Sequence, residues 1–118
     1  MGCRACLVTK YVVEYSDSQS FNWLGEELYN LLEDIGVAVS TTGGDGDYYG
    51  HWFINFDGKS GDAMLEYIAE LKTLPPDEVN KYFVDNDDVT NEYVLSVFEE
   101  WLKQSEVSGS SSIRIHWL

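Results

Sequence analysis

The apolar residues of this 118-residue chain change their spacing from one segment to the next, and this change limits the folds that it can adopt. From Ala5 to Tyr15, apolar side chains occupy both alternating positions, a pattern typical of a strand in the middle of a sheet. Between Phe21 and Ile35 they recur at helical spacing. We expect the polar turn at residues 16–20 to supply the N-cap of this helix and Gly36 to cap its other end.

The next two segments predict a hairpin. Apolar residues alternate with smaller ones at 37–41, and an aromatic strand is expected over 48–56. Glycine and aspartate dominate residues 43–47 between them, as in the tip of a hairpin. Apolar residues at 63, 64, 67, 68 and 71 outline a second helix, and the prolines at 75 and 76 must stop it.

The last part of the chain predicts two more helices and a closing strand. A short helix is expected over residues 77–83, followed by an acidic turn at 85–88 and a third principal helix. Residues 113–117 alternate apolar and basic side chains, as a strand does. The expected core face of the third helix consists of Val89, Tyr93, Val94, Val97, Phe98, Trp101 and Leu102, with Glu92, Glu99 and Glu100 outward.

This order of elements predicts one α+β domain over residues 1–118: a single antiparallel sheet of about four strands with helices packed on one face, in the ferredoxin-like β-α-β-β-α-α-β order. In that arrangement the first strand lies centrally, between the last strand and the aromatic strand. The last strand then runs antiparallel to the first and brings His116 near Cys6, whereas His51 is expected at the far end.

The chain is strongly acidic, with 21 Asp and Glu against 7 Lys and Arg and a formal net charge of -14. This charge disfavours direct binding to nucleic acid or to an anionic membrane. No apolar run approaches the ~18 residues of a membrane span, and the first residues lack a secretory signal. We therefore expect a cytoplasmic protein, whose charge serves either solubility alone or the binding of a basic partner.

Cys3 and Cys6 have the spacing found in redox pairs and in half of many zinc sites. A redox pair normally precedes a helix, whereas this pair precedes a strand. A zinc site would need more ligands, of which His116 is the nearest candidate in the expected sheet. A small metal-binding or ligand-binding domain that uses these three residues is therefore the alternative function, and acylation at the cysteines is a further alternative.

Nothing in the sequence indicates catalysis. The chain has two histidines, neither of them in a catalytic motif, and its serines cluster in segments typical of loops. A catalytic site needs a nucleophile with its base, a pair of carboxylates in a cleft, or a metal. We expect a protein that is not an enzyme and has no cofactor.

The acidic residues form two rows on the expected helices. Asp62, Glu66 and Glu70 follow one another every four residues, which places them roughly 6 Å apart along one face of the second helix. The second row begins in the acidic turn and continues on the third helix, with Asp85, Asp88 and Glu92 at spacings of three and four and Glu99 two turns later. Asp87 in the same turn is a further candidate contact. Phosphates along a nucleic acid strand are also several ångströms apart, so these rows indicate mimicry of nucleic acid.

In size, charge and carboxylate rows the chain resembles the small acidic inhibitors that phages and mobile elements encode, such as anti-CRISPR and anti-restriction proteins, and the immunity proteins of nuclease toxins. The resemblance implies a non-catalytic inhibitor that binds the basic nucleic-acid-binding surface of a host protein or a toxin. Exposed aromatic residues, such as Tyr48 or Tyr49, are candidate anchors beside the acidic rows. The aromatic strand is also a candidate sheet edge for a homodimer.

Overall fold

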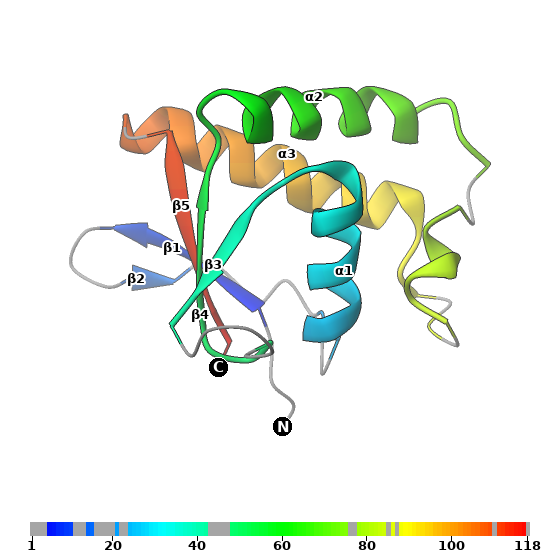
Figure 1. Ribbon diagram of the computed structural model, residues 1–118, viewed down its shortest axis with the longest axis horizontal. Coiled ribbons are helices and arrows are strands. Elements are labelled where there is room, and N and C mark those ends of the chain that lie inside the picture. Colours follow the sequence, from blue (N-terminus) through cyan, green and yellow to red (C-terminus); the bar gives the residue numbers. More distant parts are fainter. Residues whose placement is uncertain are drawn as a thin grey trace.

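A computed structural model describes residues 5–10, 14–15, 21, 24–42, 48–75, 78–84, 86, 88–109 and 111–117. It has the α+β class, the antiparallel sheet and the order of helices and strands that the sequence predicts (Figure 1). Its elements are β1 Ala5–Lys10, β2 Glu14–Tyr15, α1 Gly25–Ile35, β3 Val39–Thr41, β4 His51–Asn55, α2 Lys59–Leu71, the 3-10 helix η1 Glu78–Lys81, α3 Asn91–Ser108 and β5 Ser112–Trp117.

The lateral order of the strands differs from the ferredoxin-like expectation. The sheet runs β2-β1-β5-β4-β3, so the last strand lies in the middle, between the first strand and the aromatic strand. The segment expected to form one central strand over residues 5–15 instead folds back on itself, with β2 pairing antiparallel to β1. Alternation of apolar residues reports which way a side chain points and not which strand lies beside it, which is why the prediction was wrong.

The sheet has one covered face and one open face. Along β4, Trp52 and Ile54 are buried, whereas His51, Phe53 and Asn55 between them are exposed. Ile113 and Ile115 of β5 lie opposite Ile54 and Trp52 and are buried with them. Because cross-strand neighbours share a face, this alternation confirms that the helices pack on one side of the sheet.

Helix α1 buries Leu28, Leu31 and Leu32 in the core. Gly36 caps its end in the left-handed conformation, with φ 95°, as predicted. The prediction for the other end was wrong, because α1 begins at Gly25 after Leu24, whose side chain makes no capping hydrogen bond. Residues 16–20, where the cap was expected, lie outside the described part of the chain.

Helices α2 and α3 pack side by side and run in opposite directions (Figure 1). α2 begins at Lys59 and, as expected, ends before the prolines. α3 begins after Thr90, whose side-chain oxygen accepts a hydrogen bond of 3.2 Å from the backbone N–H of Tyr93. The predicted core face of α3 is confirmed. Its buried residues are Val94, Val97, Phe98 and Trp101, together with Val89 just before the helix. Tyr93 and Leu102 are partly buried against the same core.

Candidate acidic interface

The first acidic row lies exposed along α2. Asp62, Glu66 and Glu70 are all exposed and recur every four residues, so their carboxylates follow one side of the helix. No lysine or arginine lies between residues 60 and 71. The nearest basic residues in the sequence, Lys59 and Lys72, lie at the two ends of the helix. Like charges at this spacing weaken a helix slightly, so the row does not serve the stability of α2.

A hollow of about 290 Å³ joins α2 to α3 beside this row. Its apolar lining includes Leu65, which is 59% exposed, and the partly buried Leu102. Three acidic residues line it: Asp57 from the turn between β4 and α2, Asp62 from α2 and Glu106 from α3. Among the described residues, no lysine or arginine lines this hollow. We call this hollow and the α2 row the acidic groove.

The start of α2 is pressed against the end of β4, and this contact shapes one wall of the groove. Gly61 lies so close to the carbonyl oxygen of Phe56 that a Cβ there would collide with it. Gly61 and Phe56 both line the hollow. A glycine is therefore required at this position by the close approach of the two backbones.

The second predicted row is described in part. Asp88, Glu92 and Glu99 are exposed, whereas Asp85 and Asp87 lie outside the described residues. Glu92, Glu99 and Glu106 recur every seven residues and so lie on one side of α3. Glu106 lines the hollow, which connects this side of α3 to the groove. Glu92 also lies in the first turn of α3, where an acidic side chain stabilises the helix dipole.

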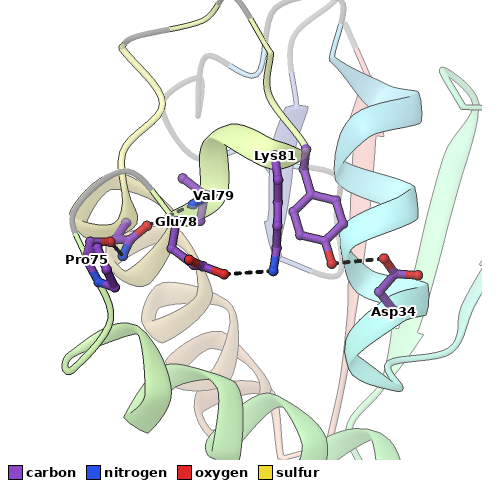
Figure 2. Close-up of polar contacts among 7 residues, drawn as sticks. Asp34, Pro75, Glu78, Val79 and Lys81 are labelled. Carbon is purple, nitrogen blue, oxygen red and sulfur yellow. Dashed lines mark hydrogen bonds and ion pairs between the residues drawn. The ribbon is translucent and has the colours of Figure 1, made fainter.

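A third acidic region, where α1 meets η1, is compensated (Figure 2). Lys81 Nζ lies 2.7 Å from Glu78 Oε1, and this hydrogen bond raises the pKa of Lys81. The Tyr82 hydroxyl donates a 2.9 Å hydrogen bond to Asp34 Oδ2 of α1. Burial, together with the neighbouring Tyr82, Glu78 and Glu70, raises the pKa of Tyr67 above its usual value. The Asp34 hydrogen bond joins the end of η1 to α1, and Glu78 is paired with a lysine, which distinguishes these acids from those of the groove.

Tyr48 and Tyr49 are half-buried, so the expectation that they are exposed was wrong. The Tyr48 ring packs edge-on against Tyr29 at 5.3 Å between centroids, and the Tyr49 ring against Trp117 at 5.4 Å. The Tyr49 hydroxyl oxygen also accepts a 3.1 Å hydrogen bond from the backbone N–H of Gly25. Both tyrosines therefore pack the turn before β4 against the rest of the protein. Contacts of this kind between distant segments cannot be read from a sequence pattern.

The metal alternative depended on Cys3, Cys6 and His116. Cys6 does lie opposite His116 in the register of β1 and β5, as predicted, while Cys3 lies outside the described residues. His51 was expected at the far end but lies opposite His116. The reason is that β4 pairs with β5, whereas it was expected to pair with β1. Within the described part of the chain, no three His, Cys, Asp or Glu side chains are grouped so that they could hold a metal ion.

The open face of the sheet carries a second hollow, which the sequence did not reveal. It lies on β3, β4 and β5 beside the two histidines, and Arg114 and Phe53 are among its lining residues. Burial, followed by the neighbouring charges of His51 and Arg114, lowers the pKa of His116 below its usual value. The alternation in residues 113–117 could have placed Arg114 on the open face, but not beside Phe53.

In the acidic groove, sequence reasoning found the α2 row and missed Asp57, Leu65, Leu102 and Glu106. The available signal was Leu65, an apolar residue between Asp62 and Glu66 on the polar side of the helix. No helix within the described residues combines the length and the apolar character needed to cross a membrane. We found no match to this chain among protein-family models, curated proteins or solved structures.

Proposed function

We propose that this protein is a non-catalytic inhibitor whose acidic groove binds the basic nucleic-acid-binding surface of a partner protein. The observation that carries the proposal is the convergence of Asp57, Asp62 and Glu106 around the exposed Leu65, with no basic side chain among the described lining residues. Carboxylates brought together in this way repel one another. Their arrangement is favourable only when a cationic group enters the groove.

Charge alone would make the association of such a protein with its partner fast and would make their binding sensitive to salt. A net charge of -14 steers a basic partner toward it and raises the association rate at low ionic strength. The row of Asp62, Glu66 and Glu70, at roughly 6 Å per step, offers the partner anions at a spacing comparable to that of phosphates. The groove would therefore compete with nucleic acid for the same lysines and arginines.

Leu65 supplies an apolar contact, which charge alone does not provide. Its side chain is 59% exposed, and the apolar side chains of Leu102 and Phe56 line the same hollow. An apolar anchor within a charged rim is the usual arrangement of a protein interface that binds specifically. The aliphatic stem of an arginine or lysine could lie on this apolar lining while its charged end meets the carboxylates.

In this proposal the protein acts in the cytoplasm, has no cofactor and carries out no chemical step. The partner is a basic nucleic-acid-binding protein of the host, such as a CRISPR effector or a restriction enzyme, or a nuclease toxin. The protein itself does not bind nucleic acid, because its excess charge repels phosphates.

The test compares two variants that remove the same charge from different places. Glu66→Gln with Glu106→Gln changes the groove, while Glu26→Gln with Glu33→Gln removes two exposed glutamates from α1. A partner is first recovered from lysate and purified, and its affinity for each variant and its displacement from nucleic acid are then measured at low and high salt. We expect the groove variant to lose roughly tenfold in affinity and the α1 variant to lose much less.

A third variant, Leu65→Ser, separates the anchor from the charge. It should weaken binding at every salt concentration without changing the slope of affinity against salt. If the groove and α1 variants weaken binding equally, only the bulk charge matters and the groove is not the interface. If none of the three variants changes the competition with nucleic acid, the proposal is wrong.

A further inference from the structure

The open face of the sheet contains a hollow of about 240 Å³ that no part of the acidic groove explains. It is lined by residues of β3, β4 and β5 and by Thr42, which follows β3. Its lining residues are Ser40, Thr41, Thr42, His51, Trp52, Phe53, Arg114 and His116. The groove between α2 and α3 lies on the helices, which cover the other face of the sheet, so the two sites can be tested separately.

The register of the strands decides which side chains meet in this hollow. Phe53 of β4 lies opposite Arg114 on β5 and opposite Ser40 on β3. Two residues along β4, His51 lies opposite His116, and the two imidazole rings stack at 3.7 Å. Residues two apart on a strand share a face, so the guanidinium, the phenyl ring and the imidazoles all belong to the open face.

The chemistry of these side chains favours an anion. Arg114 is exposed and is the one described lining residue with a permanent charge, and Ser40 and Thr42 add hydroxyl groups that can donate hydrogen bonds. No aspartate or glutamate is among the lining residues that the structure describes, although 21 occur in the chain. Among the described lining residues, an anion in this hollow therefore meets donors and a positive charge and no carboxylate.

Phe53 indicates what else the ligand carries. Its side chain is 42% exposed, in a sheet whose other face buries its large apolar residues. A phenyl ring that lies opposite a guanidinium, two residues along the strand from the stacked imidazoles, offers a flat apolar surface on which a second ring can pack. We propose that this hollow binds a small organic anion, a carboxylate or a phosphate monoester carried on a planar ring.

Charge also excludes larger occupants. Salt screens charges that lie more than about 8–10 Å away, which favours a small anion held close to Arg114. A polyanion such as nucleic acid would extend over the surface of a protein with a net charge of -14 and be repelled. A second copy docked on this face around a two-fold axis would place the basic side chains of both copies together, with no acid among the described lining residues to compensate.

The experiment titrates the isotopically labelled full chain with benzoate, phenyl phosphate and the neutral benzyl alcohol, and follows backbone amides and imidazole protons by NMR. We expect saturable shifts at residues 40–42, 51–53 and 114–116 with at least one of the two anions, and roughly tenfold weaker binding of benzyl alcohol. The stronger of the two anions identifies the charged group. Benzyl alcohol that binds as tightly as both anions would overturn the proposal, as would anions that shift none of these residues.

Two variants assign the parts of the ligand, and a third is the control. Arg114→Gln should weaken both anions roughly tenfold. Phe53→Ser should weaken phenyl phosphate but not inorganic phosphate, which has no ring. Lys103→Gln removes an exposed positive charge from α3, outside the hollow, and should change neither affinity. Equal losses in Arg114→Gln and Lys103→Gln would show that the anions respond only to net charge, and the proposal would then be wrong.

Discussion

The imidazole rings of His51 and His116 lie stacked across β4 and β5, with centroids 3.7 Å apart and planes 9° apart. Ring nitrogens bind metals in the plane of the ring, so two parallel rings do not direct their lone pairs at one ion. The stack instead brings into contact two groups that carry like charges when protonated, and Arg114 lies two residues from His116 on the same face of β5. Of the two rings, His116 is the buried one.

The first prediction concerns the pH dependence of stability. Burial, then the charges of His51 and Arg114, lowers the pKa of His116 below its ordinary value of 6.5, so the folded state disfavours its proton. The unfolded chain binds that proton first as the pH falls below 6.5, which lowers the free energy of unfolding. Above that pH both states are neutral at this residue, and it has no effect.

Urea unfolding at about pH 7.5 and at about pH 5.5 measures this effect. The difference between the free energies of unfolding at the two pH values should be smaller in His116→Gln than in the natural protein. In His51→Gln it should be reduced only in part, because burial is the largest cause of the shift. A pH dependence that is the same in His116→Gln as in the natural protein would contradict the assignment.

The second prediction compares two tyrosines that differ in one contact. Among the described residues, the buried Tyr67 hydroxyl has no hydrogen-bond partner, whereas the Tyr82 hydroxyl donates to Asp34. Tyr67→Phe removes an unsatisfied buried group and should leave stability unchanged or raise it by up to ~1 kcal/mol. Tyr82→Phe should cost about 0.5–1 kcal/mol. Thermal unfolding of the two variants side by side measures these differences. A larger loss of stability in Tyr67→Phe than in Tyr82→Phe would show that the Tyr67 hydroxyl is hydrogen-bonded.

The third prediction concerns Asn91, the buried first residue of α3. Its Oδ1 accepts a 3.1 Å hydrogen bond from Val79 N–H, and its Nδ2 donates one of 2.6 Å to the carbonyl of Pro75 (Figure 2). Asn91→Ala leaves both backbone groups without this partner and should cost about 2–3 kcal/mol. Asn91→Asp keeps the acceptor and loses the donor, so its cost should be intermediate.

Ser96→Ala is the matched control, because Ser96 is exposed and its hydroxyl donates a hydrogen bond within its own helix, to the carbonyl of Tyr93. It should change the free energy of unfolding by less than about 0.5 kcal/mol. The same urea titrations measure all three variants. An Asn91→Ala variant as stable as Ser96→Ala would show that the loop after α2 is not held by this side chain.

The fourth prediction tests whether the acidic row on α2 opposes stability. Glu66 lies one turn from Asp62 and from Glu70, and like charges at this spacing destabilise a helix. Glu66→Gln should therefore raise the free energy of unfolding by about 0.2–0.5 kcal/mol at low salt, and the gain should shrink as salt is added. Glu92→Gln should have the opposite sign, because Glu92 lies in the first turn of α3. A loss of stability in Glu66→Gln would show that the row contributes to the fold.

The identity of most elements follows from local patterns. Period 3.6 places Leu28, Leu31 and Leu32 on the buried side of α1, and the same period leaves Asp62, Glu66 and Glu70 on the exposed side of α2. These predictions succeed because a helix determines which side chains share a side from spacing alone. For the same reason, the α2 row of the candidate interface was visible in the sequence.

The sequence by itself thus determined the α+β class, the order of the elements and the side of each helix that carries charge. The tertiary structure decided that β5 lies between β1 and β4, and with that the pairing of His51 with His116 and of Phe53 with Arg114. The packing of α2 beside α3 placed Leu65 and Leu102 in the lining of one hollow. The physical reason is that side-chain period reports which way a residue faces. The choice of a neighbour depends instead on backbone pairing and packing between segments far apart in the chain.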